Sequence, residues 1–208
     1  MNVRHWAWRG LTVAACLAAW PAAHATNGYF PHGFGLKAKG MGGASLALTH
    51  DGFAGVNTPA QTAWAGNRLD VGAEIFSPSR SATVATPMGP MTVESDKQHF
   101  LIPELGFTTR LSGPLSAGLT VYGNGGMNTE LPGSNVTCMN PNNGQPYQGN
   151  LLCGQGKLGV DLMQLVVAPT LAYKVDAQHS FGVSPLLVLQ QFKASGLDAF
   201  AGFSMAPS

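Results

Sequence analysis

Charged residues are scarce in this chain of 208 residues. Lys, Arg, Asp and Glu make up 10% of it, with a net charge of +1, whereas a soluble domain usually carries about 25%. The mean hydropathy is nevertheless only +0.08, which is low for a bundle of membrane helices. Low charge with moderate hydropathy is typical of a membrane β-barrel, where apolar and small polar residues alternate. The near-neutral charge gives no support to nucleic-acid binding, which uses basic patches.

Long apolar runs are also missing beyond residue 25, where no stretch approaches the roughly 18 residues of a spanning helix. Residues 1–25 resemble a secretory signal peptide, with Arg4 and Arg9, a short apolar run, and a small-x-small site ending at Ala25. A lipoprotein site at Cys16 is disfavoured because only about five apolar residues would precede it, fewer than the usual 7–15. An exported, charge-poor chain without spanning helices is predicted to reside in the bacterial outer membrane.

Cysteine is rare, with three residues in the chain. Cys16 leaves with the signal peptide, and Cys138 and Cys153 remain in a polar connection. An even pair in an oxidising compartment predicts a disulfide between them. No histidine stands near either one in the sequence, so a metal site is not expected.

Catalytic and nucleotide-binding motifs are absent as well. The chain has no GxxxxGK[ST] or GxSxG motif. The sequence GMGG at residues 40–43 lacks the GxGxxG spacing of a dinucleotide-binding loop. We therefore expect neither an enzyme nor a cofactor.

Alternation with period two begins near residue 67 and predicts strands. In residues 68–76, for example, Asp70 and Glu74 share one face while Val71 and Ile75 share the other. The predicted strands are residues 68–76, 98–111, 115–122, 163–175 and 180–189.

These runs are long enough to cross a bilayer as tilted strands. Their connections alternate between short turns at 112–114 and 176–178 and long polar loops at 77–97 and 123–160. This asymmetry is typical of an outer-membrane barrel with short periplasmic turns, and it favours an all-β transmembrane antiparallel barrel over a soluble β-sandwich. About five strands do not close a barrel, so we interpret residues 67–208 as the first strands of a longer protein.

Residues 26–66 precede the first strand and show no strand alternation. Glycines at 42 and 43 suit tight packing, and residues 41–52 are predicted to form a short helix. We interpret this segment as an N-terminal hatch that plugs the barrel.

Three stretches together resemble the FadL/TodX family of outer-membrane transporters for long-chain fatty acids and other hydrophobic compounds. They are GFGLKAKGMGGASLALTHDGFAGVNTPA at 33–60, YGNGGMNTEL at 122–131 and QQFKASGL at 190–197. The resemblance implies a monomeric barrel of about fourteen strands, closed by a hatch corresponding to residues 26–66. The family's Asn-Pro-Ala hatch turn corresponds to Asn57, Thr58, Pro59 and Ala60, where Thr58 separates the Asn from the Pro.

The resemblance also implies an inward kink in the third strand, which opens a lateral exit into lipid. The matching residues are Tyr122, Gly123, Asn124, Gly125 and Gly126. Glycines suit such a kink because they weaken strand pairing, although an ordinary loop would begin in the same way. Lateral exit is favourable for apolar solutes, since each CH₂ that leaves water gains about 0.8 kcal/mol.

In the family, a basic residue of the fifth strand helps to hold the ligand carboxylate. The matching residue is Gln191, and Lys193 with the same parity is the candidate cation. Alternation places both on the lipid side with Phe181 and Leu189, so a bulge would be needed to turn them inward; otherwise Lys193 is a solvated strand end. The expected partners are a long-chain fatty acid and outer-membrane lipid. Uptake of aromatic hydrocarbons, or a structural or adhesion barrel without transport, are the alternatives.

Overall fold

The computed structural model describes residues 30–47, 51–86, 89–125, 127–134, 136–140 and 142–203. The predicted signal peptide, the first residues of the predicted hatch and Gly126 lie outside the described residues. Strands make up about half of the structure, which confirms the all-β class. Within the described residues, no helix combines the length and the apolar character needed to cross a membrane.

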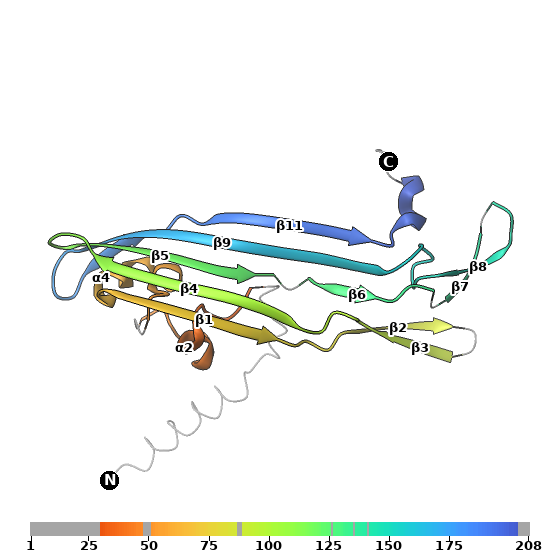
Figure 1. Cartoon of the computed structure of the whole chain (residues 1–208), viewed down its shortest axis with the longest axis horizontal. Helices are drawn as coiled ribbons and strands as arrows, with labels where there is room; N and C mark the ends of the chain where they lie inside the picture. The colour runs from red at the N-terminus through yellow and green to blue at the C-terminus, as the bar shows by residue number, and fades with distance from the viewer. Residues whose placement is uncertain are drawn as a thin grey trace, which may run out of the picture.

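The main sheet is antiparallel, and its first four strands in spatial order also follow the order of the chain (Figure 1). They are β1 (Arg68–Phe76), β4 (Phe100–Arg110), β5 (Leu115–Asn124) and β9 (Leu158–Lys174). The short turns between β4 and β5 and after β9 lie at one end of the sheet, as the sequence predicted. Every strand predicted from the alternation is present.

The last predicted strand, residues 180–189, is two strands in the structure. β10 (Ser180–Val183) and β11 (Leu187–Ser195) both pair with β9. Their register is continuous, because Val183 is opposite Leu171 and Leu187 is opposite Val167. The break falls around Pro185, whose missing N–H cannot donate to a ladder.

The connections predicted as long loops contain further strands. Residues 77–97 include a hairpin of β2 (Ser81–Thr86) and β3 (Gly89–Glu94). Residues 123–160 include β6 (Thr129–Leu131), which pairs with β9, and a hairpin of β7 (Val136–Met139) and β8 (Pro146–Gly149). Cys138 of β7 and Cys153 form a disulfide with an S–S distance of 2.08 Å, as predicted. A short 3-10 helix, η2 (Asp198–Phe203), follows β11.

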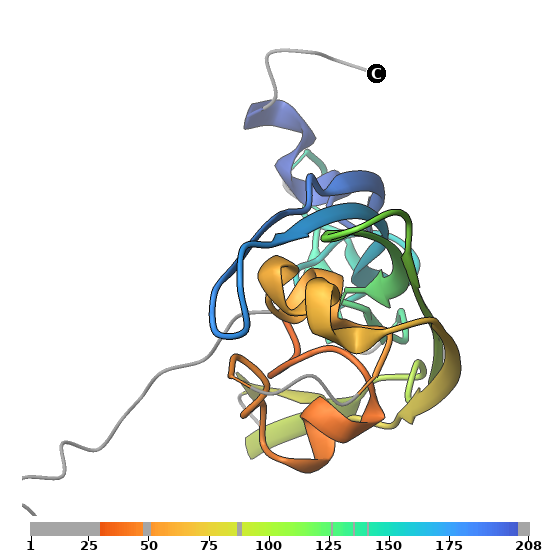
Figure 2. The same cartoon turned by 90° about the vertical axis from the view of Figure 1, so that its left-hand side faces the viewer.

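The N-terminal segment lies inside the curve of the main sheet (Figure 2). It contains α2 (Leu36–Gly40), α3 (Ala54–Asn57), the 3-10 helix η1 (Pro59–Gln61) and α4 (Thr62–Ala65). The helix predicted for residues 41–52 is wrong for the described part of that range, 41–47 and 51–52, which contains no helix. Gly42 and Gly43 have φ angles of 65° and 89°, which form a turn that ends α2 instead.

Backbones of this segment and the sheet approach each other closely. A Cβ built at Gly106 of β4 would lie 2.6 Å from the carbonyl carbon of Gly52. A Cβ built at Gly55 of α3 would lie 2.2 Å from the hydroxyl oxygen of Thr170 in β9. Glycine is therefore required at both contacts, and these contacts hold the segment against the concave face.

The two faces of the sheet have inverted polarity. Thr108 and Thr120, at 0% and 1% exposure, are buried on the concave side. The alternate residues Val71, Ile75 and Leu101 are 71–74% exposed. In a water-soluble sheet the apolar face is the one that packs on the core. Strands β1, β4 and β5 show the reverse pattern, whereas β9 also places the apolar Val166 and Ala168 on the buried side.

Candidate functional site

The third long strand, β5, is interrupted in the middle of the sheet. It pairs with β4 from Ser116 to Tyr122, but Gly123 and Asn124 pair with β9 alone. Between the pairs Asn124↔Gln164 and Thr129↔Val160, the β5–β6 side advances five residues while β9 advances four. One additional residue on one side is the signature of a bulge, and β4 and β5 are no longer paired beyond Tyr122.

This separation leaves an opening in the sheet, which we call the window. It has a cavity volume of about 220 Å³ and lies between residues 100–103 of β4 and 162–165 of β9. Below it, the β4–β5 ladder ends at the pair Glu104↔Tyr122. Above it, the Asp96 N–H, in the connection after β3, donates to the Glu130 carbonyl of β6 at 2.8 Å. This hydrogen bond joins the two sides of the window.

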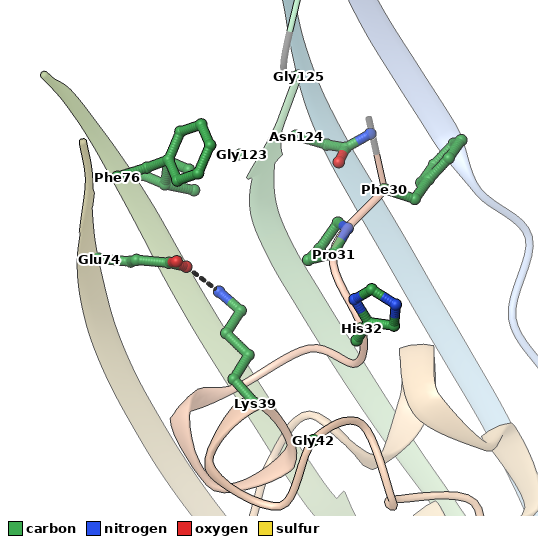
Figure 3. A pocket seen from close by; sticks show the side chains of 11 residues that line it. Phe30, Pro31, His32, Lys39, Gly42, Glu74, Phe76, Gly123, Asn124 and Gly125 are labelled. Carbon is green, nitrogen blue, oxygen red and sulfur yellow. Dashed lines mark hydrogen bonds and ion pairs between the residues drawn. The ribbon is translucent and has the colours of Figure 1, made fainter. Parts of the chain in front are cut away.

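A second cavity, the inner pocket, has a volume of about 670 Å³ and is shown in Figure 3. Three parts of the chain line it: the N-terminal segment with Phe30, Pro31 and His32, α2 with Lys39, and strands β1, β4 and β5. Its volume is within the range of small-molecule sites. The residues shared by the inner pocket and the window are Phe76, Ile102, Gly123, Asn124 and Gly125. The two cavities therefore lie next to each other at the interruption of β5.

Lys39 joins α2 to two strands of the sheet. Its ammonium group forms an ion pair with Glu74 of β1 and lies 3.3 Å from a carboxylate oxygen of Glu104 in β4 (Figure 3). The Glu104 side chain is only 2% exposed, and its Oε1 has no hydrogen-bond partner among the described residues. Because a buried carboxylate without a counter-ion is costly, Lys39 is the group that stabilises Glu104 in its place.

An aromatic contact lies beside this ion pair. The rings of Phe34 and Tyr122 have centroids 4.2 Å apart, and Tyr122 is 3% exposed. Asn57 fixes the Phe34 backbone, because its amide donates to the Phe34 carbonyl at 2.8 Å and accepts from the Phe34 N–H at 3.0 Å. The N-terminal segment therefore covers Tyr122, which is the last residue of β5 that pairs with β4.

The predicted hatch turn lies at the other end of that segment. The Thr58 hydroxyl donates to the Leu46 carbonyl at 3.0 Å, so the inserted threonine ties two parts of the segment together. Pro59 and Ala60 pack against β10: the Ser180 hydroxyl donates to the Ala60 carbonyl at 3.0 Å. A Cβ at Gly182 would lie 2.4 Å from Pro59. Asn57 and the Pro59–Ala60 pair therefore hold opposite sides of the segment in place.

The two residues predicted to bind a carboxylate lie away from the inner pocket. Gln191 of β11 is opposite Met163, and Lys193 is opposite Asp161. Lys193 lines a separate polar cavity of about 360 Å³ together with Lys157. Hydrogen bonds to Glu130 and Asp96 raise the pKa of Lys157 above its ordinary value. The ligand role of Gln191 and Lys193 stays a prediction that the register does not favour.

Sequence patterns did not identify three charged residues of the site: Lys39, Glu74 as its partner, and Arg80 in the window. The alternation placed Glu74 on one face with Asp70, but nothing in the sequence pairs it with a lysine of α2. Arg80 lies in a connection without periodicity. Within the described residues, no group of His, Cys, Asp or Glu is placed to hold a metal ion.

Comparisons of the chain with protein-family models, with curated proteins and with solved structures find no match.

Proposed function

We propose that this chain forms the front part of an outer-membrane barrel for passive uptake of hydrophobic compounds, with long-chain fatty acids as the substrates. The observation that carries this proposal is the inverted polarity of the sheet. Large apolar side chains on the outward face are exposed on every long strand; they include Leu69, Val71, Ile75, Leu101, Phe107, Leu119, Met163, Leu165, Leu171, Tyr173, Phe181, Leu187 and Leu189.

Lipid is the solvent that suits this face. A contiguous apolar surface of this kind in water would be an aggregation liability, whereas burial of apolar area is favourable by roughly 25 cal/mol per Å². The polar groups on the concave side, such as Thr108, Thr120 and Glu104, then line an interior or contact the N-terminal segment.

A complete wall requires partners for the outer edges of β1 and β11, which have none among the described residues. Unpaired backbone groups in the hydrocarbon region cost several kcal/mol each. We infer that further strands pair with both edges and close the barrel. The short turns at 112–114 and 176–178 then face the periplasm, and the two hairpins face outward from the cell.

In this arrangement the N-terminal segment is the hatch, and the window is the lateral exit. A solute held in the inner pocket reaches the window through the residues that the two cavities share. Lateral release into lipid keeps its hydrocarbon out of water, so diffusion down a gradient is sufficient and no cofactor is needed. A barrel that served only adhesion or envelope integrity would have no use for an opening in its wall.

Blocking the window tests the proposal in the full-length protein. A Cβ at Gly123 would lie 3.1 Å from Ile102, so Gly123→Leu places a bulky side chain in the window. Ala73→Leu adds a similar side chain on the exposed outward face of β1 and is the matched control.

The measurement is uptake of labelled oleate by cells that depend on the full-length protein, with equal amounts of each variant in the outer membrane. We expect Gly123→Leu to reduce uptake to the level of cells without the protein, and Ala73→Leu to leave it unchanged. A wild-type protein that transports toluene but not oleate would identify the aromatic-hydrocarbon channel. A wild-type protein that moves neither would overturn the transport function.

A further inference from the structure

Arg80 is a partly buried cation that has no counter-ion among the described residues. It follows β1 in the connection to β2 and lines the window. Its guanidinium lies 5.2 Å from the ring centroid of Phe100, and its Nη2 donates to the Lys97 carbonyl at 2.6 Å. Its Nε is buried and has no hydrogen-bond partner among the described residues, and none of their ion pairs involves Arg80.

An anion would satisfy the part of this guanidinium that has no partner among the described residues. Burial removes water from the guanidinium and lowers the pKa of Arg80 from its ordinary value. An unpaired buried donor bears the full cost of its desolvation. A carboxylate is the natural complement, because the planar guanidinium offers it several N–H donors at once.

The rest of the window is lined mostly by apolar side chains, together with the amides of Asn124, Asn128 and Gln164. Phe76, Ile102, Leu162 and Leu165 line it, and Phe76 and Ile102 continue into the inner pocket. A ligand that matches both parts therefore has one anionic group and a hydrocarbon portion.

The charges at the far side of the inner pocket fix the direction of such a ligand. Lys39 is already engaged by Glu74 and Glu104, so that cluster carries an excess of negative charge. A carboxylate placed there would be repelled by two others. The acid group therefore belongs at Arg80 and the hydrocarbon in the inner pocket.

We propose that Arg80 binds the carboxylate of an amphipathic monocarboxylic acid whose hydrocarbon chain extends through the window into the inner pocket. This assignment rests on the proposed transport function and names the group that recognises the substrate. It places carboxylate recognition in the β1–β2 connection, away from Gln191 and Lys193 of β11.

The test compares oleate with oleyl alcohol, which has the same chain without the charge. Binding of each is measured by calorimetry with the full-length protein in detergent. Arg80→Gln removes the charge, Arg80→Lys keeps it, and Arg110→Gln at the opposite end of β4 is the control. Charge-assisted hydrogen bonds of this kind change affinity by roughly 10-fold to 100-fold.

We expect Arg80→Gln to weaken oleate binding by that factor and to leave oleyl alcohol binding unchanged. Arg80→Lys should retain part of the affinity, and Arg110→Gln all of it. Oleate binding that survives Arg80→Gln, or equal losses for oleate and oleyl alcohol, would overturn the role of Arg80 while leaving transport intact. Failure of the wild-type protein to bind either ligand would instead overturn the proposed function on which this assignment rests.

Discussion

The side chain of Lys39 connects the N-terminal segment to β1 and β4 of the main sheet. Replacing it with Gln leaves the nearly buried Glu104 without a cation, and we expect the contact of α2 with β1 and β4 to weaken by about 1–3 kcal/mol. Hydrogen exchange of the amides of residues 39–43 in the full-length protein measures this effect, since these amides donate within α2 and its terminal turn.

Lys193→Gln, which removes the same charge from an exposed position of β11, is the control and should leave the exchange rates unchanged. If the amides of residues 39–43 exchange at the wild-type rate in Lys39→Gln as well, the ion pair does not hold α2 against the main sheet.

The sequence predicted the structural roles of some single residues but not of others. Cys138 and Cys153 were predicted by cysteine count and compartment, and they pair as expected. Asn57 was predicted as a turn residue, but its hydrogen bonds to Phe34 span 23 positions and leave no local signal. Arg80 could not be predicted, because its importance arises from a cavity formed by β4, β5 and β9.

At the scale of elements, the alternation predicted β1 at its observed bounds and β5 at its observed start. It missed the first five residues of β9, whose pairing depends on β6 and β11. The glycines at 123 and 125 indicated a weak point in β5. The upper border of the window could not be predicted, because the contact between Asp96 and Glu130 joins the connection after β3 to β6, far apart in the chain.

The β7–β8 hairpin is the element that the disulfide stabilises. The double variant Cys138→Ser, Cys153→Ser loses a link that closes a loop of 15 residues, worth about 3 kcal/mol in the unfolded-chain model. We expect faster limited proteolysis within residues 136–153 and an unchanged thermal transition of the main sheet, since the β5–β9 ladder does not include the hairpin.

Dithiothreitol should have the same effect on the wild-type protein and no further effect on the double variant. A loss of the main-sheet transition on reduction would show instead that the disulfide supports the whole fold.

At the scale of the whole molecule, the sequence predicted which residues share a face, because period two is a local property. It did not predict that Lys39 would attach the N-terminal segment to the concave side, or that Asn57 would fix Phe34 against Tyr122 of β5. These contacts are long-range, and their partners lie on separate elements. The proposed function depends on two features, an outward face that contacts lipid and an interior that is occupied by the N-terminal segment.

The outward face is tested most directly by spin labels along β9. Single nitroxides at Leu171 and Tyr173, which are exposed, and at Ala172, which is 2% exposed on the opposite face, are placed in the full-length protein in outer-membrane vesicles. Collision rates with oxygen, which concentrates in lipid, are compared with those of a water-soluble nickel chelate. We expect high oxygen and low nickel accessibility at Leu171 and Tyr173, and low accessibility to both at Ala172. High nickel accessibility at Leu171 and Tyr173, or the absence of alternation along β9, would contradict a lipid-facing barrel wall.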